Sequence, residues 1–591
     1  MPKGMKNMRT LLLMIFAALS LSVSAQTITL NGNVKDTTGE PIIGASIVEK
    51  GNTTNGTITD LDGNFSLKVP ANATVVISYI GMKTQEIAIK GKSKIDVTLS
   101  DDAKSLDEVV VIGYGTAKRK DITGSVASVN SETLAAIPVA SATEALQGKM
   151  AGVQITTTEG SPDAQMSIRV RGGGSITQSN EPLFIVDGFP VESISDIPPT
   201  DIESIDVLKD ASSTAIYGAR GANGVIIVTT KSGKEGKVSV SYNAYYAWKK
   251  VAKTLDVLSA SDYTKWQYEL AQLTNKNDDY IKYFGNYQDL DMYDNVATND
   301  WQDLTFGRTG HSFNHNLSIN GGSDKFKYSF SYSHIDDKAI MQMSDYARDN
   351  LNLKLNHKPL KNVSLDFSAR FSKTKINGGG SNDANSSLNT DKRLKYSLLY
   401  TPYPVPGISD ALNADEEDAN SLLINPLISL RDNDTRKERI NYNLAGSITW
   451  EIIKDLKLKA EVGYDDYRNN ADRYYGVTTY YVRNNVDDED KSKPAISFTR
   501  GTRTAFRSTN TLSYDFKKFF KNNKNHLNLL AGQEYIVTRE RELRNVVHGF
   551  PTEYTADDCI NYSTKGNPYE VTNYGYPDDV LFSFFGRANY D

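Results

Sequence analysis

The strongest constraint on the fold lies in the second half of the chain, where apolar and polar residues alternate in many separate segments. In residues 237–248 every second residue from Val238 to Trp248 is apolar or aromatic, while the residues between them are mostly polar. The alternation recurs, less regularly toward the end, in residues 326–332, 363–371, 440–450, 456–464 and 582–590. Successive side chains of a β-strand point to opposite faces, so each segment is expected to form a strand with two different faces.

About ten such segments, many of them ending in an aromatic residue, are typical of a transmembrane antiparallel β-barrel with a lipid face and a lumen face. The mean hydropathy of -0.44 agrees with a barrel, because half of every strand would face a wet lumen. Within one segment, Phe330 is expected to face lipid and Ser329 and Ser331 to face the lumen. The alternative is a soluble antiparallel sheet with one solvated face, and the aromatic strand ends weigh against it.

The first residues predict export. Basic residues precede an apolar run at residues 11–19, and small residues lead to an expected cleavage between Ala25 and Gln26. This order is that of a secretory signal peptide, here residues 1–25. The apolar run is shorter than the ~20 residues that a spanning helix needs. No cysteine follows the cleavage position, so no lipid anchor is expected.

Two regions before the barrel segments have the pattern of small domains. Residues 26–103 alternate short β-rich runs with glycine turns, which predicts an immunoglobulin-like β-sandwich. Its Asp60–Asn64 segment is interpreted as a hairpin turn and not as a calcium loop, because flanking helices and a distal glutamate are missing. Residues 119–235 combine strands, a capping box at Ser141 and an Asp-Gly turn, which predicts an α+β domain.

The linker at residues 104–118 contains a short aliphatic strand. Val109 to Ile112 follow an acidic pair and precede a glycine, which predicts one extended β-strand. Since this strand lies between two complete domains, two interpretations are open. Either it is buried in the protein, or it is free to add to the sheet edge of another protein.

The regions on both sides of the linker resemble known families. Residues 32–79 are similar to the carboxypeptidase-regulatory-like domain, and the marks of the resemblance are "PIIGASI", "GTITDLDGNFSL" and "ISYIGM", the last of which ends at Met82. Residues 182–233 contain "PLFIVDGFPV" and "DIESIDVLKDASSTAIYGARGANGVIIVTTKSG". They resemble the plug of the SusC/RagA family of TonB-linked outer-membrane proteins. The residues singled out in this plug signature are Asp187, Gly188, Asp201, Glu203, Lys209, Asp210, Tyr217, Gly218, Arg220 and Gly221.

The resemblance implies an energy-coupled importer in the outer membrane, with its N-terminal domain in the periplasm. In the family a TonB box precedes the plug. Here the box would consist of Asp107, Glu108, Val109, Val110, Val111, Ile112 and Gly113. The resemblance also implies energy from the TonB-ExbB-ExbD complex, a SusD-like surface lipoprotein as a lid, surrounding outer-membrane lipid, and an oligosaccharide or peptide as cargo.

Other function classes fit the sequence less well. A structural or secretory barrel, such as an usher or adhesin, is one alternative, but the plug of an usher lies inside the barrel sequence. A carboxypeptidase-like enzyme is another, but the chain has no His-Glu-x-x-His motif, so no enzyme is expected. The net charge of -6 gives no reason to expect a nucleic-acid partner.

The barrel region is short for the family. Plugged outer-membrane transporters have ~22 strands, and residues 236–591 have room for about half of them. Open strand edges in lipid would leave unsatisfied backbone groups, each at a cost of several kcal/mol. We therefore expect the sequence to be a fragment or a truncated form of a longer family member.

Candidate metal and cofactor sites are weak. His311 and His315 would lie ~13 Å apart on a strand, too far for one metal ion. The acidic runs at residues 415–418 and 487–490 are interpreted as solvated loops, where calcium binding has no support. Cys559 is the single cysteine, so no intramolecular disulfide is expected, and the sequence contains no cofactor fingerprint.

Overall fold

The computed structural model describes residues 27–37, 39–79, 82, 84–100, 109–112, 115–118, 126–135, 139–157, 163, 166–177, 179–378, 393–406, 424–484, 489–516 and 527–590. The chain forms two compact units. One contains the N-terminal β-domain, and the other contains the plug domain and a large antiparallel sheet.

The N-terminal domain is a sandwich of two sheets, as the sequence predicts. One sheet has the order β4-β1-β7 and the other has the order β3-β2-β5-β6. The strands are β1 (Thr27–Lys35), β2 (Ser46–Glu49), β3 (Asn52–Ile58), β4 (Asn64–Pro70), β5 (Thr74–Ser78), β6 (Gln85–Ala88) and β7 (Lys94–Thr98). In β4, Phe65, Leu67 and Val69 are buried while the residues between them are exposed, so the alternating apolar face builds the core between the sheets.

The predicted turn after β3 is present, but it is not a hairpin. The Asp60 carboxylate accepts hydrogen bonds from the backbone N–H groups of Asp62 at 3.0 Å and Asn64 at 2.8 Å. This local pattern is typical of an Asp-initiated turn. However, β3 and β4 belong to different sheets, so the turn carries the chain from one layer of the sandwich to the other. The hairpin prediction is wrong because a turn has the same sequence pattern whether it joins two paired strands or carries the chain between two sheets.

The aliphatic linker strand is β8 (Val109–Ile112), and it pairs with β9 (Gly115–Lys118) in a two-stranded sheet. The sequence left open whether this strand is buried or free. In the structure its partner strand is the next segment of the same linker.

The plug domain is an α+β unit built on a five-stranded sheet of order β10-β15-β16-β13-β14. A separate pair, β11 and β12, completes it. The strands are β10 (Val126–Asn130), β11 (Val153–Thr157), β12 (Met166–Val170), β13 (Leu183–Val186), β14 (Phe189–Val191), β15 (Ile202–Leu208) and β16 (Val225–Thr230). The short helices are α3 (Ser131–Ala135), α4 (Ala142–Ala145), η2 (Pro199–Asp201), α5 (Ala211–Thr214) and η3 (Ala215–Gly221). One half of the predicted capping box at α4 is confirmed, because Ser141 Oγ accepts from the Glu144 N–H at 3.1 Å. The Glu144 carboxylate accepts from the Ala140 N–H at 3.3 Å, one residue before the expected position.

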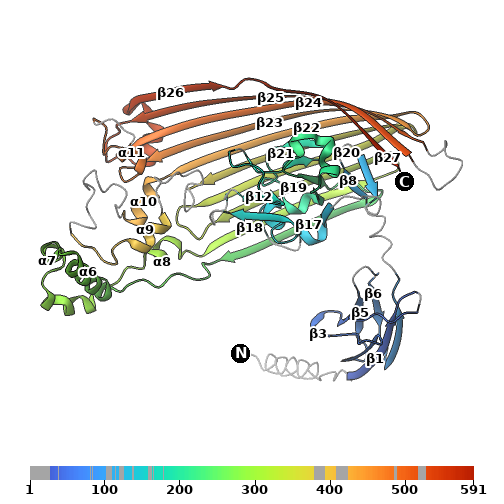
Figure 1. The fold of residues 1–591 in the computed structure, drawn as a ribbon, viewed down its shortest axis with the longest axis horizontal. Helices are drawn as coiled ribbons and strands as arrows, with labels where there is room; N and C mark the ends of the chain where they lie inside the picture. Colours follow the sequence, from blue (N-terminus) through green and yellow to red (C-terminus); the bar gives the residue numbers. More distant parts are fainter. Residues whose placement is uncertain are drawn as a thin grey trace, which may run out of the picture. The chain divides into compact units, whose positions relative to one another are not determined.

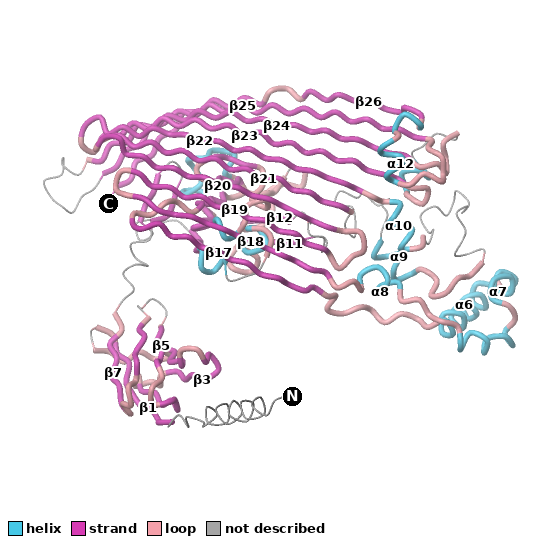
Figure 2. The backbone as a smooth tube through the Cα atoms, turned by 180° about the vertical axis from the view of Figure 1, so that it is seen from behind, coloured by secondary structure: helices cyan, strands magenta, loops and turns pink. Residues whose placement is uncertain are grey.

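After the plug the chain forms one large sheet in which neighbouring strands pair antiparallel (Figures 1 and 2). Its 11 strands are β17 (Gly236–Lys249), β18 (Gly310–Gly322), β19 (Phe326–Lys338), β20 (Asp345–Leu360), β21 (Val363–Asn377), β22 (Thr435–Ile453), β23 (Leu456–Tyr475), β24 (Ala495–Asp515), β25 (Leu527–His548), β26 (Asn567–Gly575) and β27 (Asp579–Tyr590). The antiparallel, barrel-type sheet predicted from the alternation is therefore confirmed.

The two ends of the sheet differ. At one end tight turns join the strands, at residues 323–325, 361–362 and 454–455. At the other end lie longer connections with the helices α6 (Ala260–Thr274), α7 (Asn277–Phe284), η4 (Tyr287–Asn295), α8 (Trp301–Phe306), α9 (Arg393–Leu399), α10 (Pro426–Asp432), α11 (Tyr480–Asn484) and α12 (Ala556–Asn561). We name these the turn end and the loop end. Within the described residues, no helix combines the length and the apolar character needed to cross a membrane.

The two faces of the sheet differ as the alternation predicts. On the outward face of β22, apolar side chains such as Leu444, Ile448 and Trp450 are each 44% exposed. The inward face carries polar side chains that the plug covers, such as Ser329 and Ser331, each 6% exposed. An apolar outer face and a polar inner face are the two surfaces that a barrel strand in lipid requires.

The last strand of the sheet is broken by a bulge. β26 pairs with residues 541–548 of β25, and β27 pairs with residues 527–538 of the same strand. Between them the register shifts by one residue around Pro577, which has no N–H to donate to the ladder. The 11 strands therefore occupy ten positions, because β26 and β27 share one. The alternation of residues 582–590 gives no indication of this bulge.

Candidate functional site

The plug touches the inner face of the sheet through the hairpin β13–β14 and the loop that follows it. Asp187 and Gly188 form the hairpin turn, with φ angles of 51° and 85°. Two consecutive residues with positive φ make the tight turn whose twist matches the flanking strands, which explains why Asp-Gly occurs here. The predicted hairpin is confirmed, and its tip points at the inner face of β20–β24. We call the inner face of the large sheet the wall.

Asp187 is an ionic anchor at this tip. Its carboxylate accepts hydrogen bonds from the Thr230 N–H at 2.9 Å and the Thr230 hydroxyl at 2.7 Å. On the wall, Lys354 Nζ lies 2.7 Å from Oδ1 and Arg370 Nη1 lies 3.7 Å from Oδ2. Burial alone would raise the pKa of the Asp187 carboxyl, but the adjacent ammonium and guanidinium groups hold that pKa below its usual value.

A second anchor surrounds Arg507 of β24, which is 4% exposed in its side chain. Its guanidinium donates to the Gly188 carbonyl of the plug and lies 2.9 Å from Glu461 and 2.8 Å from Glu534. Glu534 also accepts from Arg220 of the plug at 2.7 Å. Two arginines and two glutamates thus link the plug to strands β23, β24 and β25. Removing one partner of such a buried group leaves an uncompensated charge.

A third set of contacts lies toward the loop end. Arg348 of β20 is 2% exposed and donates to the backbone carbonyls of Ser195 and Ala140. Arg439 of β22 lies 2.6 Å from Asp163 and 3.2 Å from Asp196, both in the plug. Burial raises the pKa of the Asp163 carboxyl, and the Arg439 charge only partly offsets that rise. The wall therefore presents cations to acceptors on the plug at several positions between the turn end and the loop end.

Asp201 is a buried plug carboxyl that accepts hydrogen bonds from neutral side chains of the sheet. It is 4% exposed and accepts from Asn316 Nδ2 of β18 at 3.4 Å. Burial raises its pKa, and hydrogen bonds from Ser331 and Asn316 work in the opposite direction. This carboxyl therefore has a weaker preference for its charged form than Asp187 has.

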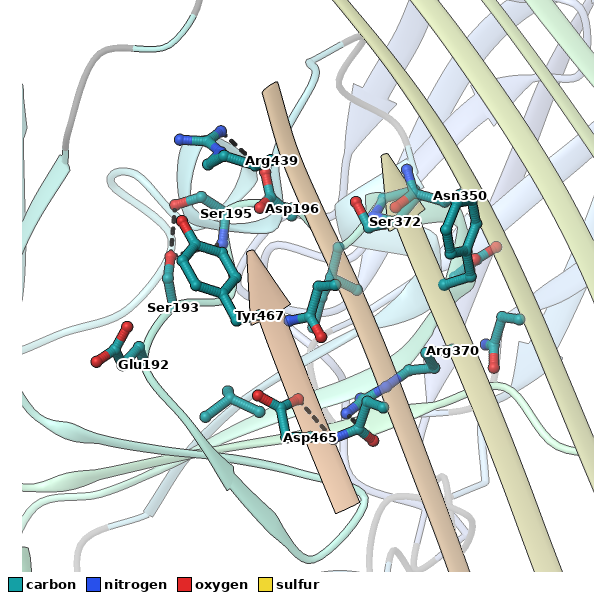
Figure 3. A pocket seen from close by; sticks show the side chains of 18 of the residues that line it. Glu192, Ser193, Ser195, Asp196, Asn350, Arg370, Ser372, Arg439, Asp465 and Tyr467 are labelled. Atoms are coloured by element: carbon teal, nitrogen blue, oxygen red, sulfur yellow. Dashed lines mark hydrogen bonds and ion pairs between the residues drawn. The ribbon is translucent and has the colours of Figure 1, made fainter. Parts of the chain in front are cut away.

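Between the plug and the wall lies a polar cavity of about 290 Å³, shown in Figure 3. We call it the loop-side cavity, because it lies on the half of the strands nearer the loop end. Its labelled lining residues are Glu192, Ser193, Ser195, Asp196, Asn350, Arg370, Ser372, Arg439, Asp465 and Tyr467. Amides, hydroxyls, carboxylates and guanidinium groups can hydrogen-bond a polar ligand in many orientations, and Tyr467 adds aromatic surface.

The plug-signature residues divide into two groups. Asp187, Gly188, Asp201 and Arg220 contact the wall, as described above. The other signature residues support the plug fold or lie on its surface. Asp210 caps α5 by accepting from the Ser213 N–H at 2.9 Å. Gly218 has a φ of 59°, which explains why the helical segment bends there.

Of the remaining signature residues, Lys209 donates to the Ala151 carbonyl. Gly221 packs so closely that an added Cβ would lie 3.0 Å from the Thr214 carbonyl oxygen. Burial raises the pKa of Tyr217 to about 12. Glu203 makes an exposed ion pair of 3.3 Å with Lys234.

Several predicted residues lie outside the described part of the chain. These are Ala25 and Gln26 of the expected cleavage position, Asp107, Glu108 and Gly113 of the expected TonB box, the acidic run 415–418, and residues 487–488. Val109–Ile112, the aliphatic core of the expected box, form β8.

The wall residues that hold the plug were missed by the sequence analysis. Lys354, Arg370, Arg439 and Arg507 all occupy inward positions of barrel strands. The alternation shows that these charged residues face the lumen. Their partners on the plug are visible only in the folded protein.

The two histidines that are four residues apart lie on a strand, as the alternation predicts. His311 and His315 lie on β18, opposite Trp248 and Ala244 of β17. His311 Nδ1 is 2.8 Å from the Tyr246 hydroxyl. In the described ranges, no group of three or more His, Cys, Asp or Glu side chains is arranged to hold a metal ion.

Family comparisons agree with the two-domain interpretation of the first part of the chain. Residues 118–225 match the family model of the TonB-dependent Receptor Plug Domain. Residues 30–111 match that of the CarboxypepD_reg-like domain.

Known proteins resemble the chain over a larger part of its length. It is 43% identical to the TonB-dependent receptor SusC of Bacteroides thetaiotaomicron over 360 residues, covering 59% of this chain and 34% of that protein. It is 32% identical to the TonB-dependent receptor P3 of Formosa agariphila, covering 99% of this chain and 57% of that protein. The solved RagAB peptide importer in its 'open-open' state has a TM-score of 0.65 at 26% identity, covering 82% of this chain and 55% of that one.

The chain thus spans 34% to 57% of the length of these relatives. Two of them are named as receptors and one as an importer, in agreement with the expectation that the chain is not an enzyme.

Proposed function

We propose that this chain, which belongs to the SusC/RagA family of TonB-dependent receptors, contains the plug and part of the wall of an outer-membrane importer for polar nutrients. The observation that carries the proposal is the plug held against the polar wall by ion pairs. Such contacts close the lumen at rest, yet they are made of side chains that can separate and become solvated when the plug is displaced.

The work of displacing the plug is assigned to the linker strand. A passive pore needs no coupling, but a plug that is tied by buried ion pairs requires work to move. We assign residues 107–113 the role of a TonB box, which adds as a strand to the sheet of TonB and transmits force from the TonB-ExbB-ExbD complex. Because β8 is paired with β9 in the structure, its edge or its pairing must become available before TonB engages it.

The cargo is assigned by the chemistry of the loop-side cavity. Its lining combines amides and hydroxyls with charged groups, which suits an oligosaccharide or a peptide better than an apolar compound. RagAB is a peptide importer, which supports a peptide as one of the two cargo classes. A SusD-like surface lipoprotein is the partner that we assign to the loop end.

The test separates coupling from binding. In cells with the native protein, uptake of a fluorescent oligosaccharide mixture and of a fluorescent peptide mixture is measured beside binding of the same probes to isolated outer membranes. Deletion of residues 107–113 should abolish uptake of the transported probe and leave its binding unchanged. Retained uptake would refute the coupling role.

A point variant sharpens this experiment. Val110→Pro removes one backbone N–H from the strand and constrains its backbone, so pairing with another sheet should fail. Val110→Thr keeps the N–H and the β-branched shape, and it should transport normally. Equal uptake by the two variants would contradict recognition through strand addition.

A further inference from the structure

A second cavity lies directly beyond the first along the same wall strands. This turn-side cavity has a volume of about 280 Å³ and is lined by Asp187, Lys354, Ser368, Ser447, Lys459 and Glu461, among others. It lies nearer the turn end than the loop-side cavity, and both use the inner faces of β20, β21, β22 and β23.

No wall residue separates the two cavities on three of these strands. Inward positions of a strand are two residues apart. On β21 the loop-side cavity ends at Arg370 and the turn-side cavity begins at Ser368. On β22 the corresponding neighbours are Asn443 and Ala445, and on β20 they are Asn352 and Lys354. The wall therefore forms one continuous polar groove.

What divides the groove comes from the plug. The Asp187 carboxylate lies 3.7 Å from Arg370 Nη1 and closes one side of the groove. Arg370 Nη2 then donates to Asn443 Oδ1 at 2.8 Å, and Asn443 Nδ2 donates to Asp465 at 3.0 Å. Figure 3 shows Arg370 and Asp465 together at one end of the loop-side cavity, away from Arg439 and Asp196. This chain of polar contacts crosses β21, β22 and β23.

Phe189 completes the partition. It is 3% exposed and follows directly after the Asp187–Gly188 turn. Its ring lies against the backbone of β23 at Gly463, where an added Cβ would be 2.4 Å from Phe189 Cε2. A glycine at this inward position is therefore what allows the ring to seal the groove against β23.

The loop-side cavity retains hydrogen-bonding capacity next to this partition. Asn352 is 8% exposed, and its Oδ1 has no hydrogen-bond partner among the residues that the structure describes. Oδ1 of Asn441, which also lines the cavity, has none either. Buried polar atoms without a partner are uncommon in folded proteins, and here they point to a polar ligand that occupies the cavity transiently.

We propose that the groove along β20–β23 is the cargo path, and that the tip of the hairpin β13–β14, with Asp187 and Phe189, is the gate between its two halves. Retraction of this tip joins the cavities while the rest of the plug stays in the lumen. The cargo that fits such a path is an uncharged or zwitterionic polar chain, because the groove offers amides, hydroxyls and charges of both signs. The assignment of cargo rests on the proposed function; the gate itself does not.

The test uses cysteine accessibility in intact cells that make the native protein. Ser372→Cys reports on the loop-side cavity, and Ser447→Cys reports on the turn-side cavity. Asn316→Cys is the control, since it faces the plug from β18 and is 2% exposed. The native Cys559 is fully buried, so an impermeant maleimide added outside should give little background. In the resting protein, Ser372→Cys should be labelled, and Ser447→Cys and Asn316→Cys should be protected.

Opening the gate should change one of these reporters. Asp187→Asn removes the charge that holds Arg370 and Lys354, so labelling of Ser447→Cys should rise about tenfold or more, while Asn316→Cys stays protected. If Asp187→Asn does not assemble, Phe189→Ala opens the β23 side and leaves the ion pairs intact.

Three results would overturn the gate: labelling of Ser447→Cys in the resting protein, continued protection in both gate variants, or simultaneous labelling of Asn316→Cys, which would mean that the whole plug leaves. The assay requires no cargo, so a failure of the gate and a failure of nutrient uptake are distinguished.

Discussion

Asp187 of the plug and Lys354 of β20 form an ion pair of 2.7 Å in which the side chains are only 14% and 16% exposed. The pair shows a general feature of this interface. At most of its polar contacts the wall supplies the cation and the plug supplies a carboxylate or a backbone carbonyl, as at Arg348 and Arg439.

Loss of Lys354 should loosen the plug. Lys354→Ala leaves the buried Asp187 with the more distant Arg370, and breaking a buried pair costs about 3–5 kcal/mol. The urea concentration at which the plug becomes sensitive to protease should fall accordingly. Lys234→Ala is the matched control, because its pair with Glu203 is exposed and such pairs contribute about 0–1 kcal/mol. Equal shifts for both variants would contradict a role for the buried pair.

Glu534 should be the most sensitive residue of the second anchor. Glu534→Gln removes the carboxylate shared by Arg507 and Arg220, so Arg220 loses its ion-pair partner and the buried Arg507 keeps only Glu461. We expect trypsin to cleave the plug faster in this variant, at any of its lysines and arginines. Arg220→Met should weaken the plug less, because Glu534 keeps Arg507. A control at the exposed Glu540, Glu540→Gln, should behave like the native protein.

The two faces of β22 allow a matched test of the lipid boundary. Ile448→Arg places a charge on the outward face, at a cost of about 2–4 kcal/mol if it lies near the midplane of the bilayer. Ser447→Arg, one residue earlier, points into the turn-side cavity toward Asp366 and Glu461 and should cost far less. Assembly and heat resistance of the purified protein measure both. Similar losses would refute the face assignment.

The sequence alone suggested a different control, and the structure shows why it is unsuitable. Ser329 and Ser331 are lumen-facing, as predicted, but the plug covers them and Ser331 bonds Asp201. An arginine at either position would collide with the plug. Alternation identifies the face of a strand, whereas occupancy of the lumen depends on contacts between residues far apart in the chain.

The same distinction explains which parts of the fold were predictable. Strand periodicity, the Ser141 cap and the Asp187–Gly188 turn are local patterns, so the plug hairpin and the barrel strands follow from them. The bulge at Pro577 is a register shift between neighbouring strands, and no local pattern marks its partner. The anchors at Arg370, Arg439 and Arg507 join segments separated by more than a hundred residues, and the sequence shows only that these positions face inward.

The plug should respond to acid in two stages with opposite signs. Burial raises the pKa values of Asp163 and Asp201, so their protonation above the usual Asp range relieves an unfavourable buried charge, and mild acidification should tighten the plug. Asp187 behaves in the opposite way. Its folded-state pKa is lowered from 3.8, so the stability it contributes is complete above that value and is lost only as the pH falls below it.

Protease sensitivity of the plug, measured from neutral pH downward, should therefore fall first and rise sharply only at strongly acidic pH. Asp201→Asn should remove part of the first stage, and Asp187→Asn should raise sensitivity at neutral pH and flatten the second stage. A steady rise in sensitivity from neutral pH downward in the native protein would show that these carboxyls do not govern the attachment of the plug.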